Sequence, residues 1–154
     1  RTDGLWQHTC CEAFVMGEED VPGYYEFNFA PSSLWAGYRF HGYRAGGAAI
    51  EPVPPPAIAL AGDRGRICLD VVLSLESILE LREATRLRLA LAVVIEEKSG
   101  SLSYWALAHP SHRPDFHHAD AFALVFERSG VLGAYKNNID KILSIAMRRS
   151  AGHP

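Results

Sequence analysis

A chain of 154 residues has the length of one domain, and folding at that length buries roughly 68–70% of the extended-chain surface, so its core needs no metal or disulfide. Its 48% hydrophobic and 21% charged residues are typical of a globular protein. The formal net charge of −3 gives no electrostatic reason to expect nucleic acid or an anionic membrane as partner. The longest apolar runs are too short to span a bilayer.

The cysteines make a poor disulfide framework, because two of the three are adjacent. Neighbours on a strand point to opposite faces, so at most one of them, Cys10, would meet Cys68. We therefore expect reduced, structural cysteines and a cytoplasmic protein. No signal peptide is visible, and a first residue Arg1 in place of Met leaves open that the natural chain starts upstream.

Alternation with period two predicts strands in the first third of the chain. In 9–16, Glu12 shares a face with the apolar side chains two residues away on either side, and a following turn brings it close to Glu26. Residues 24–30 and 35–40 flank a turn-like PSSL and form a hairpin. A register centred between its two serines places Glu26 opposite Arg39.

The Gly- and Pro-rich segment 45–56 reads as a loop or an extended crossing. Further alternating strands are expected at 66–73, 86–97, 101–108 and 120–127. Helix is expected at 74–83, with Ser74 as N-cap, and over 134–150. The prediction is an all-β antiparallel sandwich over residues 1–126, followed by a C-terminal extension, 127–154, with an amphipathic helix.

Three stretches together carry a family resemblance: LWQHTCCEAFVM, YYEFNFAPSSLWAGYRFHGYR and SLSYWALAHPSHRPDFHHADAFAL. With gaps from Gly4 to about Leu124, the chain resembles the bacterial DOMON-like proteins, which are related to the ninth family of carbohydrate-binding modules. The resemblance implies a β-sandwich that binds a sugar, haem or another small ligand. Such domains usually have one more strand before the tryptophan, whereas only RTDG precedes Leu5 here. The exposed sheet edge that this leaves would be covered by the C-terminal helix or paired in a homodimer.

A polar row on the predicted hairpin is the strongest candidate site. Glu12, Glu26 and Arg39, with Asn28 and Trp35 nearby, would hydrogen-bond sugar hydroxyls while aromatic faces stack on the pyranose ring. The structural alternative is a solvent-facing cross-strand ion pair worth about 0.2–1 kcal/mol. The family's sugar modules clamp their ligand between tryptophans, so the resemblance adds Trp6, Trp35 and Trp105 as candidates, each of which is otherwise a core or edge aromatic.

Histidines gather in the segment 103–120, but their spacing matches no metal motif. Two prolines favour a rigid loop whose histidines bond to backbone, and one of His117 and His118 would face the pocket with Glu12. Haem, the family's other ligand, is held by axial pairs such as Met with His. Met16 is more simply a core residue, and no CxxCH motif is present.

An enzyme is not predicted. Glu12 and Glu26 resemble the carboxylate pair of a glycosidase, but an Arg39 between them would keep both ionised and leave no proton donor. No G-x-S-x-G nucleophile motif occurs. The sequence therefore predicts non-catalytic recognition of a small ligand, a saccharide first, without a cofactor or a bound metal. A haem- or metal-binding redox domain and a protein-interaction β-sandwich remain as alternatives.

Overall fold

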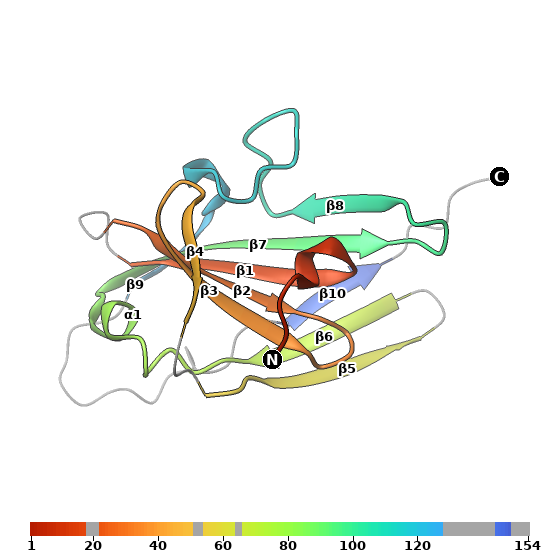
Figure 1. Ribbon diagram of the computed structural model, residues 1–154, viewed down its shortest axis with the longest axis horizontal. Helices are drawn as coiled ribbons and strands as arrows, with labels where there is room; N and C mark the ends of the chain where they lie inside the picture. The colour runs from red at the N-terminus through yellow and green to blue at the C-terminus, as the bar shows by residue number, and fades with distance from the viewer. Residues whose placement is uncertain (18–21, 51–53, 64–65, 128–143, 149–154) are drawn as a thin grey trace.

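The computed structural model describes residues 1–17, 22–50, 54–63, 66–127 and 144–148 (Figure 1). The strands are β1 Cys10–Met16, β2 Tyr24–Phe29, β3 Trp35–Gly42, β4 Ala45–Ala49, β5 Ala57–Asp63, β6 Arg66–Val72, β7 Arg86–Glu96, β8 Leu102–Ala106, β9 Leu124–Glu127 and β10 Ser144–Arg148. Short helical turns are η1 Leu5–Gln7, α1 Leu79–Glu83 and η2 Ala119–Ala121. No helix among these residues is long and apolar enough to cross a membrane.

Two antiparallel sheets confirm the predicted all-β, sandwich-like fold. The larger sheet has the order β4-β3-β2-β1-β7-β8, with β9 paired to the start of β7, and the smaller has the order β10-β6-β5. Figure 1 shows the smaller sheet lying below the larger one. Alternating apolar side chains fill the space between them, including Phe27 and Phe29 of β2 and Leu69 and Val71 of β6. We call the side of the larger sheet that faces this core its inner face.

The opposite side of the larger sheet, its outer face, is also largely covered. Near the middle of the sheet, Phe14 and Tyr24 pack with Phe116 and Phe122, which come from the segment after β8. At the other end, η1 contributes Leu5 to a second cluster. A strand covered on both sides is buried along its whole length, and every residue of β2 is buried. The period-two alternation therefore separates two covered faces, one of which carries polar residues.

The hairpin register differs from the prediction by one residue. Phe29 pairs with Trp35, and Glu26 faces Tyr38 and not Arg39. The loop holds three residues between the bonded pair Ala30 and Leu34, and its last residue, Ser33, has a φ of 64°. A three-residue hairpin loop ends in such a left-handed residue, whereas the predicted register assumed an even number of loop residues. Since side chains alternate, the slip moves Arg39 to the inner face, away from Glu26.

Two other predictions about elements were wrong, and a third was right only in part. The expected C-terminal helix is contradicted at 144–148, which pair with β6 as strand β10, while 134–143 and 149–150 lie outside the described residues. The expected loop 45–56 begins with a strand, β4, that pairs with β3. Helix over 74–83 is limited to α1. In the first case a short apolar run fits either periodicity, and the open edge of β6 favours the strand.

The cysteines are free, as expected. Cys10 packs in a cluster on the outer face, and Cys11 packs in the core between the sheets, so the two neighbours point to opposite sides of β1. Burial raises the pKa of both thiols, that of Cys11 to about 12. Both are therefore protonated, structural side chains at neutral pH.

Candidate functional site

Three polar side chains are buried together on the outer face, and we call them the buried acid cluster: Glu12, Glu26 and Asn28. They are 4%, 6% and 0% exposed, respectively. Asn28 lies opposite Glu12 in the strand pairing, and its side-chain N–H donates to Glu26 Oε1 at 2.8 Å. The Asn28 Oδ1 atom is buried and accepts no hydrogen bond from the described residues. The sequence correctly predicted that these residues share a face and lie close together.

Burial controls the charge of this cluster. It raises the pKa of Glu12 to about 8, with a further upward contribution from the charge of Glu26, while the positive charge of Arg44 acts in the opposite direction. Burial also raises the pKa of Glu26, against the hydrogen bond from Asn28 and the charge of Arg44. Glu12 therefore keeps its proton at neutral pH, unlike an exposed carboxyl group.

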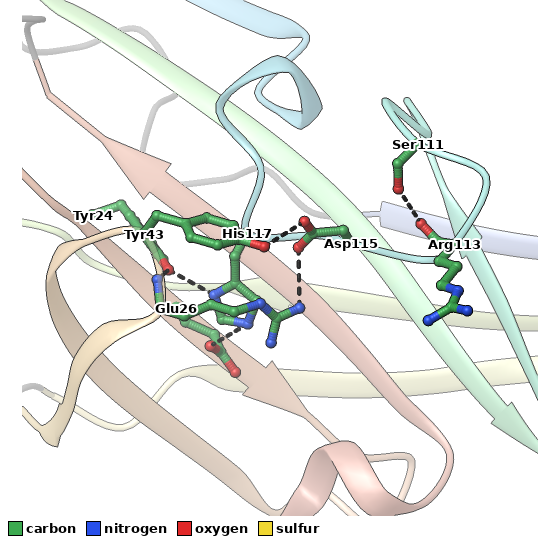
Figure 2. A network of polar contacts seen from close by, with 8 residues as sticks. Tyr24, Glu26, Tyr43, Ser111, Arg113, Asp115 and His117 are labelled. Carbon is green, nitrogen blue, oxygen red and sulfur yellow. Dashed lines mark hydrogen bonds and ion pairs between the residues drawn. The ribbon is translucent and has the colours of Figure 1, made fainter.

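His117 lies between Tyr24 and Glu26 of the buried acid cluster (Figure 2). Its ring packs edge-on against Phe14, with centroids 5.1 Å apart, and against Phe40 at 5.2 Å. Its Nδ1 atom is 2.6 Å from the Tyr24 hydroxyl, and its Nε2 atom is 3.8 Å from Glu26 Oε2. His117 therefore contacts both the aromatic rings of the outer face and the buried acid cluster.

The hydrogen bonds around Tyr24 define the protonation of His117. The Tyr24 hydroxyl accepts the backbone N–H of Arg44 at 3.3 Å, and we assign its own hydrogen to the bond with His117 Nδ1. Burial, together with the charge of Arg44, lowers the pKa of His117 to about 4, so the ring is neutral at pH 7. A neutral ring that accepts at Nδ1 carries its hydrogen on Nε2, the atom that faces Glu26.

Asp115 ties the loop that carries His117 to the β3–β4 hairpin. Its carboxylate accepts from the Tyr43 hydroxyl at 2.7 Å and from the Arg44 guanidinium at 3.0 Å. Figure 2 shows Tyr43 reaching across to Asp115 beside the His117 ring. The loop is also braced internally, since Ser111 Oγ donates to the Arg113 carbonyl at 2.5 Å. These contacts hold His117 over the buried acid cluster without any regular element between β8 and η2.

A hollow of about 530 Å³ opens beside this arrangement. We call it the outer hollow, and its lining includes Met16, Tyr24, Tyr43, His117, His118 and Phe122. Tyr43 is 59% exposed, and the Arg44 guanidinium lies 5.8 Å from the centroid of its ring. Ligand sites typically combine apolar walls with a few convergent polar groups, and the outer hollow has both.

The structure separates the three tryptophans. Trp6 lies on the outer face, 44% exposed, with its ring edge-on to Tyr38 at 6.1 Å. Trp35 is buried in the core between the sheets. Trp105 is 62% exposed, but its pairing with Val93 places it on the inner-face side. No pair of them can clamp one ligand at the outer hollow.

Arg39 also lies apart from the predicted site. Its guanidinium is over the Tyr25 ring, 4.7 Å from the centroid, and 3.9 Å from a carboxylate oxygen of Glu80. Its charge therefore does not bridge Glu12 and Glu26. Arg44, four positions beyond the end predicted for that strand, is the cation whose charge reaches both carboxyls.

Two of the other loop histidines bond to the backbone, as predicted. His109 Nε2 accepts the backbone N–H of Ala106 at 3.1 Å, and His118 Nδ1 accepts that of Asp120 at 3.2 Å at the start of η2. The described residues contain no group of three or more His, Cys, Asp or Glu side chains that would hold a metal ion.

Sequence reasoning missed two residues that line the outer hollow, Tyr24 and Tyr43, and two that bond to these tyrosines, Arg44 and Asp115. Tyr24 carried a signal, since alternation places it on the face of Glu26. Tyr43 and Arg44 lie in a turn next to a glycine-rich segment, and their contact with Asp115 spans about seventy residues, which no local pattern indicates.

No family model, no curated protein and no solved structure matches this chain. The resemblance to DOMON-like domains therefore rests on the sequence motifs alone.

Proposed function

We propose that this protein binds a small ligand without transforming it, that the ligand is a saccharide, and that it binds in the outer hollow. The observation that carries the proposal is the position of an exposed tyrosine ring, Tyr43, directly beside a row of fixed polar groups. Sugar recognition needs both: a flat apolar surface for the C–H face of the ring and convergent hydrogen-bonding groups for its hydroxyls.

In this proposal the Tyr43 ring stacks on the sugar. The Asp115 carboxylate and the half-exposed Arg44 guanidinium beside it supply an acceptor and donors for neighbouring hydroxyls. These groups already bond to one another, so they are held in place before the ligand arrives, which lowers the entropic cost of binding. His118, on the same wall, adds a further polar contact.

The non-catalytic assignment rests on burial and not on the arginine bridge expected from the sequence. Glu12, with its raised pKa, would be a competent proton donor. However, both carboxyls lie beneath His117 and Tyr24 and are at most 6% exposed, so the glycosidic oxygen of a sugar in the outer hollow does not come within hydrogen-bonding distance of them while His117 is in place. A general acid must come within hydrogen-bonding distance of the leaving oxygen.

Haem receives weaker support from this geometry. Met16 and two histidines do line the outer hollow, which is the pairing that an axial Met–His set requires. Yet His117 Nδ1 bonds to Tyr24, its Nε2 faces Glu26, and His118 Nδ1 accepts a backbone N–H. Because these histidine nitrogens already have partners, the residues that line the outer hollow fit a haem iron poorly. Haemin can be titrated into the protein while the Soret band is recorded. A shift of this band that is absent in Met16→Leu would favour haem over a saccharide as the ligand.

The direct test is a glycan array, followed by titration calorimetry with the best sugar. We expect Tyr43→Ala to weaken binding about tenfold, because the stacking surface is lost. Trp105→Ala is the matched control, since it removes an equally exposed ring from the other side of the sheet. The proposal fails if no sugar binds the intact protein, or if Trp105→Ala weakens binding and Tyr43→Ala does not.

A further inference from the structure

The buried acid cluster has more hydrogen-bond acceptors than donors. Among the described residues, Asn28 Nδ2 donates to Glu26 Oε1, and His117 Nε2–H lies 3.8 Å from Glu26 Oε2. The Asn28 Oδ1 atom receives no hydrogen bond. Buried polar groups are almost always paired, so this amide oxygen is open to a donor, either the proton of Glu12 opposite it or one that a ligand brings.

No cation among the described residues donates a hydrogen bond to this cluster. The Arg44 guanidinium acts on both carboxyls from a distance, but it is itself bonded to Asp115 at 3.0 Å and is 52% exposed. His117 is neutral, because its pKa is lowered to about 4. Within the described part of the chain, the two carboxyl groups are thus buried together without a charged hydrogen-bond donor, and their burial raises both pKa values.

The cluster lies directly behind the wall of the outer hollow. His117 lines that hollow with one side of its ring and faces Glu26 with Nε2. Its side chain is held by one hydrogen bond, to Tyr24, and by ring contacts, and it belongs to a segment without helix or strand. A rotation of the His117 side chain would connect the outer hollow with Glu26. It would also take the His117 Nε2–H group, 3.8 Å away, from Glu26 Oε2.

We propose that the outer hollow prefers a sugar that carries a protonated amino group, which takes the place of the His117 N–H beside Glu26 and turns the buried acid cluster into its anionic counterpart. This inference rests on the saccharide site proposed above. An ammonium group brings three donors and a positive charge, which match the unpaired Asn28 oxygen and the two carboxyls, whereas a hydroxyl brings one donor and no charge. Binding would ionise Glu12, so a proton is released into the buffer as the amine binds.

The test is calorimetry with three β-1,4-linked tetramers, of glucosamine, of N-acetylglucosamine and of glucose, at about pH 6, where amino groups are protonated. We expect the glucosamine tetramer to bind about tenfold more tightly than the other two, the difference between a charge-assisted and a neutral hydrogen bond. Repeating the titration in buffers of different ionisation enthalpy should show proton release for this tetramer alone.

Glu26→Gln is the informative variant, because it keeps an acceptor for Asn28 and removes the charge. It should abolish the preference for the amine, while Glu97→Gln, at an exposed turn between β7 and β8, should preserve it. Equal affinity for all three tetramers overturns this inference and leaves the saccharide site standing. Equal losses in the two variants would show attraction to the acidic surface and would also overturn it. If no tetramer and no arrayed glycan binds, the inference and the proposed function fail together.

Discussion

Replacing Glu12 by Gln should change how the stability of this protein depends on pH. The carboxyl is 4% exposed, and its pKa rises from 4.5 to about 8 on folding. Between pH 4.5 and about 8, the folded state holds a proton on Glu12 that the unfolded state has lost. Stability from this group is therefore complete below about pH 4.5 and falls as pH rises towards 8.

The size of the effect follows from the same shift. A change of one pKa unit corresponds to about 1.4 kcal/mol, so a shift from 4.5 to about 8 sets an upper limit of about 5 kcal/mol on the loss. Against a typical unfolding free energy of about 5–15 kcal/mol, this is a large fraction. Gln has the same shape and no ionisable proton, so in Glu12→Gln most of the decline should disappear.

Urea unfolding at intervals from about pH 5 to 8 measures this directly, with the fluorescence of the buried Trp35 as the reporter. The unfolding free energy of the wild type should decrease across this range by at least about 2 kcal/mol more than that of Glu12→Gln. Glu97→Gln serves as the control for removing an exposed carboxylate. Parallel curves for the wild type and Glu12→Gln would refute the assignment of a buried, protonated Glu12.

Three further outcomes are expected. Tyr24→Phe removes the hydroxyl that bonds to His117 and should lower the unfolding free energy by about 1 kcal/mol. It should also raise the pKa of His117, as measured by NMR titration, because the hydroxyl no longer bonds to the neutral ring. An unchanged titration would contradict the hydrogen-bond pattern. With a thiol reagent the native protein should react quickly at Cys68 and slowly at the buried Cys10 and Cys11, as followed by mass spectrometry. Faster labelling of Cys10 or Cys11 would contradict the burial of these two side chains. Backbone amides of 144–148 should exchange with D₂O in the alternating pattern of a strand paired on one side, in contrast to the uniform protection of a helix.

The sequence predicted the fold through its period-two alternation, and it correctly grouped Glu12, Glu26 and Asn28. The face of Arg39 was not predictable, because it depends on one residue of loop length, and the left-handed conformation of Ser33 has no glycine to indicate it. Strand β10 was missed because its short run fits a helical stripe equally well, and only the partner strand β6 decides between the two.

The candidate site was less accessible than the fold. Alternation placed the acidic residues on one face, but it did not reveal that a distant loop covers that face. The decisive contacts, from Asp115 to Tyr43 and Arg44, join segments far apart in the chain, and such contacts have no local signature. Trp35 and Trp105 were selected by residue type, and residue type does not say which side of a sheet a ring occupies.

The position of the buried acid cluster on the outer face also bears on how this site can change. The packing that holds the two sheets together uses the alternate residues of the same strands, so a substitution on the outer face leaves the inter-sheet core intact. The inter-sheet core and the clusters of the outer face are thus assigned to alternating positions along β1 and β2. Randomising only the exposed turn residues Tyr43 and Arg44, with the packed outer-face residues Phe14 and Tyr24 kept, should yield libraries with many folded members.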